Sequence, residues 1–159
     1  MRMIVELLLL VLLTGSAFAD DSRFIFFDTT VMDKHSGLIW TRDAHLAKQD
    51  WEGAFDFVNE LNRTKYGGCN DWRLPNKEQL MMLSTYAHSF GYNGINGTRT
   101  PAGLFNQLGF YKVAEDCYWS SSNDSFEIKF AWCVYMGDGT LCNPNKYEKF
   151  YIWPVRGGQ

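Results

Sequence analysis

The feature that most constrains the fold is a run of alternating apolar residues in the last third of the chain. Every second position of Phe126–Met136 is apolar: Phe126, Ile128, Phe130, Trp132, Val134 and Met136. A period of two places these side chains on one face of a β-strand, so that face is expected to be buried. Gly137-Asp138-Gly139 follows and predicts a turn into an antiparallel strand. The pattern therefore predicts a β-hairpin.

Further strands are predicted on both sides of this hairpin. Cys117–Ser121 and Tyr147–Val155 contain the aromatic and β-branched residues that strands favour. Pro154 places the second of these strands at a sheet edge or a bulge. Earlier in the chain, Phe24–Phe27 and Leu38-Ile39-Trp40 flank a turn and predict an N-terminal hairpin.

Two helices are predicted between these groups of strands. Apolar residues recur at helical spacing in Trp51–Leu61, directly after Asp50, which is a favourable N-cap residue. Asn76 and Gln79 have the spacing of a capping box and predict the start of a second helix.

A long irregular loop is predicted after the second helix. Residues 89–111 are rich in Gly, Asn and Thr and show one helical turn, at Ala102–Leu108. Loops of this length in a compact domain are often functional. The order of hairpin, two helices, long irregular loop and C-terminal antiparallel β-meander predicts the α+β class.

The first residues of the chain predict export. Arg2 precedes a short apolar stretch, and Ala17-Phe18-Ala19 has the small residues of a signal-peptide cleavage site. Cleavage would separate a signal peptide, residues 1–19, from a single mature domain, residues 20–159. An uncleaved membrane anchor is the alternative, although a span needs about 20 apolar residues. We therefore expect a secreted, periplasmic or cell-surface protein with no integral membrane segment in its mature part.

Four cysteines lie in the mature part of the chain: Cys69, Cys117, Cys133 and Cys142. An even number in an exported protein predicts two disulfides. If Gly137-Asp138 forms a two-residue turn, Cys133 faces Cys142 at a separation that suits a disulfide, and Cys69–Cys117 completes the favoured pairing. A turn one residue later makes this bridge awkward, and free buried thiols are the alternative. No two cysteines have zinc-ligand spacing, so no metal site is predicted.

Five short motifs occur in order along the chain: Ser36-Gly37-Leu38-Ile39-Trp40, Trp51-x-x-Ala54, Asp71-Trp72-Arg73-Leu74-Pro75, Tyr118-Trp119-Ser120-Ser121-Ser122 and Pro154-Val155-Arg156-Gly157-Gly158. In this order they resemble the Lcl C-terminal domain family over nearly the whole mature chain. The resemblance implies a C-type-lectin-like fold and an exported bacterial protein. More distantly the chain is similar to formylglycine-generating enzymes, but the residues around Cys133 and Cys142 do not match their cysteine pair.

The residues of these motifs are expected to build the scaffold. Trp40, Trp72 and Trp119 are expected in the core. The motif arginines Arg73 and Arg156 are expected to hold loops through hydrogen bonds. The serines of Ser120-Ser121-Ser122 are expected to form hydrogen bonds with neighbouring backbone groups.

The sequence predicts no catalytic residue, no bound metal and no cofactor. Its three histidines, His35, His45 and His88, lie outside hydrolase and metalloprotease motifs. Calcium takes about six to eight oxygen ligands, and the isolated acids of this sequence do not supply them. A net charge of −3 disfavours nucleic acid as a partner.

Loops that combine aromatic rings with Asn, Asp and Lys side chains are typical of carbohydrate-binding sites. The candidate ligand-binding residues are Tyr92, Asn93, Asn96 and Arg99 in the long loop, Asn123, Asp124 and Phe126 around the start of the hairpin, and Lys146, Tyr147 and Lys149 after it. We therefore predict a non-catalytic domain that binds a glycan or a cell-surface protein in adhesion. A protein-binding module or a subunit of a bacterial envelope assembly is the alternative.

Overall fold

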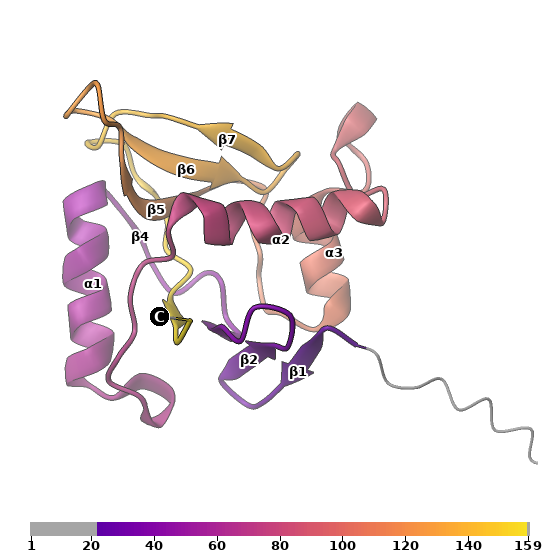
Figure 1. Cartoon of the computed structure of the whole chain (residues 1–159), viewed down its shortest axis with the longest axis horizontal. Helices are drawn as coiled ribbons and strands as arrows, with labels where there is room; N and C mark the ends of the chain where they lie inside the picture. The colour runs from indigo at the N-terminus through magenta and orange to yellow at the C-terminus, as the bar shows by residue number, and fades with distance from the viewer. Residues whose placement is uncertain (1–21, 159) are drawn as a thin grey trace, which may run out of the picture.

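The computed structural model describes residues 22–158, so the predicted signal peptide and its alternative as an anchor lie outside the described residues. Two β-sheets and three α-helices enclose two neighbouring hydrophobic clusters (Figure 1). The predicted α+β class is confirmed, and the arrangement is consistent with a C-type-lectin-like fold. Within residues 22–158, none of the helices combines the length and the apolar character that crossing a membrane requires.

The first sheet joins the two ends of the described chain. Its strands lie in the order β1 (Phe24–Phe26), β2 (Thr30–Asp33), β3 (Ile39–Thr41) and β9 (Val155–Arg156), and all pairs are antiparallel. The predicted N-terminal hairpin is therefore wrong in one respect, because β2 lies between the two strands expected to pair. Val31 explains the extra strand, since its side chain is fully buried and needs a sheet position that faces the core.

The second sheet is built mainly from the C-terminal third of the chain. Its order is β4 (Lys48–Gln49), β8 (Phe150–Tyr151), β5 (Cys117–Asn123), β6 (Ala131–Tyr135) and β7 (Thr140–Cys142). The strands β5, β6 and β7 form an antiparallel meander, as predicted, whereas β8 pairs with β5 in parallel. One face of this sheet packs on α2, and the opposite face contributes Cys117, Trp119 and Cys133 to the second hydrophobic cluster.

The predicted strand Phe126–Met136 is wrong in its first half. Only Ala131–Tyr135 forms β6, and the Phe126 and Ile128 side chains are 96% and 82% exposed. The reason is local, because the Asp124 carboxylate accepts hydrogen bonds from the backbone N–H of Phe126 at 2.7 Å and of Glu127 at 3.3 Å. Such a side-chain bond stabilises a turn in competition with the strand.

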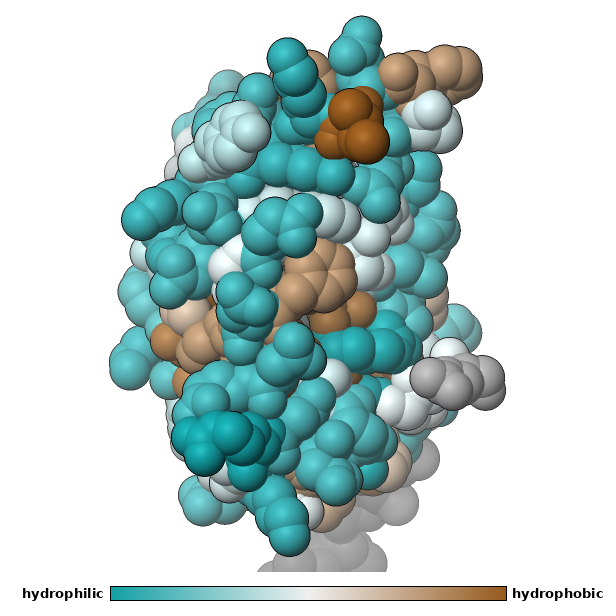
Figure 2. All heavy atoms as spheres, turned by 90° about the vertical axis from the view of Figure 1, so that its left-hand side faces the viewer, coloured by the Kyte–Doolittle hydropathy of each residue, from teal (hydrophilic) through white to brown (hydrophobic). Residues whose placement is uncertain are grey.

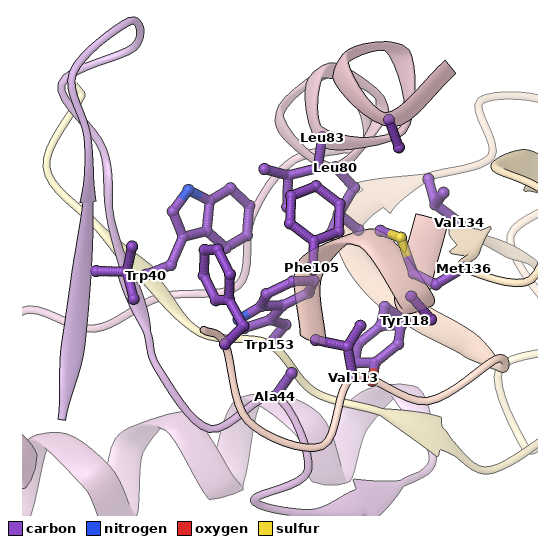
Figure 3. Packing of buried hydrophobic residues seen from close by; sticks show 14 of the residues in the cluster. Trp40, Ala44, Leu80, Leu83, Phe105, Val113, Tyr118, Val134, Met136 and Trp153 are labelled. Carbon is purple, nitrogen blue, oxygen red and sulfur yellow. The ribbon is translucent and has the colours of Figure 1, made fainter. Parts of the chain in front are cut away.

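The predicted last strand, Tyr147–Val155, is divided between the two sheets as β8 and β9. Trp153 lies in the crossover and is fully buried. Its ring centroid lies 5.3–5.7 Å from those of four aromatic residues, Trp40, Phe105, Phe110 and Tyr118. Figure 3 shows three of these rings gathered around Trp153. Burial of this indole fixes the place where the chain leaves one sheet for the other.

The first two helices begin where their capping residues predict. α1 (Trp51–Arg63) starts at Asp50, whose carboxylate accepts from Gly53 N, and α2 (Lys77–Ser89) starts with the predicted capping box of Asn76 and Gln79. The predicted helical turn in the long loop is the two-turn helix α3 (Pro101–Leu108). Single 3₁₀ turns occupy Tyr66–Gly68 and Ile95–Gly97.

The scaffold roles of the motif residues are confirmed. Trp40, Trp72 and Trp119 are at most 2% exposed. Arg73 donates to the Gln79 side chain at 2.9 Å and to the carbonyl of Gly157 at 2.8 Å, and Arg156 pairs with Asp71 at 2.6 Å. The fourth motif acts through its serines, since Ser120 Oγ donates to Trp132 O, and Ser122 Oγ accepts from Lys77 N.

Candidate functional site

Two loops from the second sheet lie side by side and carry five of the ten predicted ligand-binding residues, and a sixth, Asn123, is the last residue of β5. The β5–β6 loop comprises residues 124–130, and the β7–β8 loop comprises residues 143–149. A backbone bridge joins Phe130 to Asn145, and Lys146 N donates to Lys129 O at 2.9 Å. The two loops are therefore joined through their backbones and form one continuous surface.

Lys146 connects this surface to the start of α1. Its ammonium group lies 4.0 Å from the centroid of the Trp51 ring and donates to Asn123 Oδ1 at 2.6 Å. Its carbonyl accepts from Trp51 N at 3.0 Å, and the Trp51 indole donates to Ser120 O at 2.8 Å. A lysine held by a ring and an amide oxygen keeps a fixed position, so its charge is already oriented for a ligand.

Asp124 holds the other side of the surface. Backbone hydrogen bonding, above all from the N–H of Phe126, holds the pKa of Asp124 below its ordinary value. The Asn143 amide donates to the second carboxylate oxygen. Asp124 therefore carries a negative charge at neutral pH and fixes the turn that exposes the next aromatic ring.

Two neighbouring hollows occupy this surface. The first, of about 460 Å³, is lined by Trp51, Asn123, Asp124, Ser125, Phe126, Ile128 and Lys146. The second, of about 520 Å³, is lined by Asp50, Glu52, Ile128, Lys129, Lys146 and Tyr147. Lys146 and Ile128 border both. We call these lining residues together the Phe126–Tyr147 surface.

Large apolar side chains rise above the polar floor of the Phe126–Tyr147 surface. Phe126, Ile128 and Tyr147 are 96%, 82% and 84% exposed. Figure 2, which faces α1, shows apolar side chains projecting among hydrophilic residues at the upper end of this side. Exposed aromatic faces beside amide, carboxylate and ammonium groups can stack on a sugar ring and bond its hydroxyls.

The four predicted residues of the long loop lie elsewhere. In Figure 1 the loop after α2 is at the right, whereas the β5–β6 loop is at the upper left. Tyr92 donates to Gln107 at 2.8 Å, Arg99 stacks on the Tyr92 ring at 5.5 Å, and Asn93 caps the turn at Ile95. Asn96 is the remaining member, in the left-handed turn that follows. These side chains bond mainly within their own loop, so the structure does not bring them to the Phe126–Tyr147 surface.

The remaining predicted residues divide between the two hollows. Asn123, Asp124 and Phe126 line the first, Tyr147 lines the second, and Lys146 lines both. Lys149 belongs to the same loop and is exposed, but it is not among the residues that line either hollow.

Sequence reasoning missed several lining residues: Asp50, Trp51, Glu52, Ser125, Ile128 and Lys129. Trp51 and Ile128 were assigned to the buried faces of a helix and a strand, where the periodicity places them. The signal that could have corrected Ile128 is Asn123-Asp124-Ser125, a run of turn-forming residues directly before the alternating segment.

The cysteines lie partly as the sequence predicts. Cys133 and Cys142 are direct partners across β6 and β7, which confirms the predicted register, although the turn spans Met136–Gly139. All four cysteines are free thiols in this structure, so the two disulfides stay predictions. The Cys117 Sγ lies with those of Cys133 and Cys142, and all three atoms are within 4.8 Å of one another. Cys69 lies outside that group, near the carbonyl of Gly67.

The comparison with known families agrees with the motifs and the fold. No curated protein matches the chain. The Lcl C-terminal domain family matches residues 29–156. This range includes all three α-helices and every strand except β1. On this match over most of its length, the chain belongs to the Lcl C-terminal domain family.

Proposed function

We propose that this protein is an exported, non-catalytic domain that binds a glycan of a cell surface on the Phe126–Tyr147 surface. One observation carries the proposal: two adjacent hollows share a fixed lysine and are bordered by aromatic rings that are 96% and 84% exposed. Exposed apolar side chains that lie together and are rimmed by polar residues mark interaction sites or ligand-binding grooves. The export rests on the N-terminal sequence.

The charges of the surface favour a neutral sugar over a sulfated one. Lys129 and Lys146 are accompanied by Asp50, Glu52 and Asp124 in the same two hollows. The Lys146 ammonium is already bonded to Asn123 and stacked on Trp51. A polyanion would therefore meet carboxylates beside each lysine and gain little attraction. Sugar hydroxyls can donate to the carboxylates and accept from the lysines.

The non-catalytic character is supported by the places of the groups that hydrolases use. His35, His45 and His88 are exposed and separated along the chain, and the His88 ring contacts the carbonyl of Asp138 at 2.7 Å. Ser120 and Ser122 are bonded to the scaffold. Among the described residues, neither these two serines nor any histidine lines the two hollows.

The test is a glycan array probed with the full chain, followed by titration of the sugars that bind. Phe126→Ala and Tyr147→Ala remove one exposed ring each. We expect each to weaken binding about tenfold, because an aromatic contact contributes about 1.5 kcal/mol. Phe90→Ala is the matched control, since Phe90 is 56% exposed but lies at the C-terminal end of α2.

Three results would contradict the proposal. An array without specific binding excludes the glycan. Equal loss in the Phe90 variant places the contact elsewhere. Preference for sulfated glycans that disappears as salt is raised refutes the argument from charge. If the array is empty and one envelope protein is retained by the wild type but not by the Phe126 variant, the same surface binds protein instead.

A further inference from the structure

Three cysteines that are distant in the sequence converge on one face of the second sheet. Cys117 begins β5, Cys133 lies in the middle of β6, and Cys142 ends β7. Cys133 is paired in register with Cys142 on one side and with Trp119 on the other. Cys117 lies two residues before Trp119 and so shares its face. The meander therefore directs three thiols to one point.

The sulfur positions have the dimensions of a metal-ligand set. The three Sγ atoms all lie within 4.8 Å of one another. A zinc ion about 2.3 Å from each of three thiolates places those sulfurs roughly 4 Å apart. A disulfide would instead draw two sulfurs to about 2 Å and leave the third unpaired. One ion uses all three groups with a smaller shift.

The surroundings shield most of this cluster from solvent. Cys133 is fully buried, Cys117 is 9% exposed, and the neighbours in the same hydrophobic cluster include Trp119 and Ile152. Cys142 is less buried than the other two and marks the side open to solvent. Three protein ligands leave one position of a tetrahedron for a water molecule from that side.

The nearby charges favour a divalent cation. The carboxylates of Asp116 and Glu148 act electrostatically on Cys117. Lys48 is the cation beside them, and its ammonium group is paired with Asp116 at 2.7 Å. Loss of the three thiol protons on metal binding would place thiolates beside these carboxylates, and a divalent ion neutralises that charge more fully than a monovalent one.

We propose that Cys117, Cys133 and Cys142 bind one zinc ion. The ion would fasten β5, β6 and β7 together, and these strands carry the loops of the Phe126–Tyr147 surface. Binding replaces the three thiol protons, which pass to solvent, with no change in oxidation state. The inference does not depend on the glycan proposal, because the three cysteines lie in strands β5, β6 and β7 and not in the two loops of the Phe126–Tyr147 surface.

The test uses the full chain, reduced and freed of metal with a chelator. Cobalt(II) serves as an optical probe, and its thiolate charge-transfer bands should appear at one equivalent and disappear when zinc displaces it. Zinc analysis should give one ion per chain. An alkylating reagent should modify Cys69 and Cys142, the two more accessible thiols, in the metal-free protein and only Cys69 in the zinc form. Zinc should also raise the melting temperature.

Two variants make the assignment specific. Cys142→Ser removes the most accessible of the three ligands. Loss of a residue that only supports a ligand lowers metal affinity about 10- to 100-fold, so we expect loss of this ligand to lower zinc affinity by more than that. Cys69→Ser is the matched control and should bind zinc like the wild type. Protection of the thiols in the wild type supplies the readout if the Cys142 variant does not fold.

Four outcomes would overturn the proposal. The first is absence of stoichiometric zinc in the reduced wild type. The second is zinc that all variants retain, which would be adventitious. The third is equal weakening by Cys69→Ser. The fourth is a protein isolated with Cys133 and Cys142 joined as a disulfide that zinc and mild reductant do not replace.

Discussion

The ion pair between Arg23 and Asp33 locks the first two strands of the N-terminal sheet. Asp33 accepts from Arg23 Nε at 2.7 Å, from Arg23 Nη2 at 2.5 Å, from Ser36 Oγ at 2.7 Å and from His35 N at 3.0 Å. The side chains of Asp33 and Arg23 are 1% and 13% exposed. The carboxylate thus also holds the turn between β2 and β3.

Replacing Asp33 with Ala should be strongly destabilising. It leaves the Arg23 guanidinium partly buried without its counter-charge and removes the acceptor for the turn. Breaking a buried pair in this way costs about 3–5 kcal/mol of unfolding free energy. For a domain of this size we expect the melting temperature to fall by about 10–15 °C, measured by calorimetry or circular dichroism.

Glu60→Ala is a control with the same contact geometry. Arg63 donates to Glu60 from Nε at 2.7 Å and from Nη2 at 2.5 Å, but the side chains are 72% and 52% exposed on the surface of α1. Solvent screens this pair, so its removal should leave the melting temperature close to that of the wild type. If both variants lose similar stability, burial is not what makes the Asp33 pair strong, and the reasoning fails.

The pH dependence gives a second check on Asp33. Burial raises the pKa of Asp33, but hydrogen bonds from Arg23 and Ser36, the Arg23 charge and the His35 N–H outweigh it and hold the pKa below its ordinary value. The folded form therefore gains stability above the unfolded pKa of about 4, and loses it as pH falls through the lower folded pKa. Acid titration of unfolding should show this loss in the wild type and a smaller one in Asp33→Ala.

Two further pairs of variants test the core and the long loop. Trp153→Phe breaks the hydrogen bond to Thr41 O at 2.9 Å, whereas the buried Trp40 indole N–H has no hydrogen-bond partner among the described residues. Urea unfolding should therefore show Trp153→Phe to be about 1–3 kcal/mol more destabilising than Trp40→Phe, and equal losses would contradict this. Gly94 and Gly97 both have left-handed φ, at +69° and +68°, but a Cβ on Gly94 would lie 2.2 Å from Gly137 O and one on Gly97 has no atom within 4 Å. Gly94→Ala should thus be the more destabilising by about 1–3 kcal/mol in the same assay, and a reversed order would show that this loop can leave the β6–β7 turn without cost.

The helices were predictable because their signals are local. Asp50 and Asn76 each accept a backbone N–H within three residues, and the α1 stripe needs only one apolar partner surface to be buried. Those contacts do not depend on which distant segment packs against them. The start of both helices and the extent of α1 therefore follow from the residues themselves.

The errors in the predicted strands have one physical origin. Alternating apolar residues indicate that a segment favours the β conformation, but they do not show which segment it pairs with. Phe126 and Ile128 continue the period of Trp132 and Val134, but the Asp124 carboxylate closes a turn before a strand can form. In the last segment, Trp153 belongs to a core that is completed by residues from both sheets, α2 and α3, so no local pattern marks the change of sheet. The candidate site depends on the first of these errors, since the turn is what exposes its aromatic ring.

The cysteines show how far spacing arguments extend. Zinc-ligand spacing describes sites built from one or two short turns, and none of these cysteines fits it. An antiparallel β-meander can bring metal ligands together in another way, because its register places one residue of each strand side by side on the same face of the sheet. The register that opposes Cys133 to Cys142 also determines where the β5–β6 loop meets the β7–β8 loop. A shift by one residue would turn Cys142 away and would also displace Lys146 from Lys129. The thiol cluster and the Phe126–Tyr147 surface are therefore consequences of the same strand alignment.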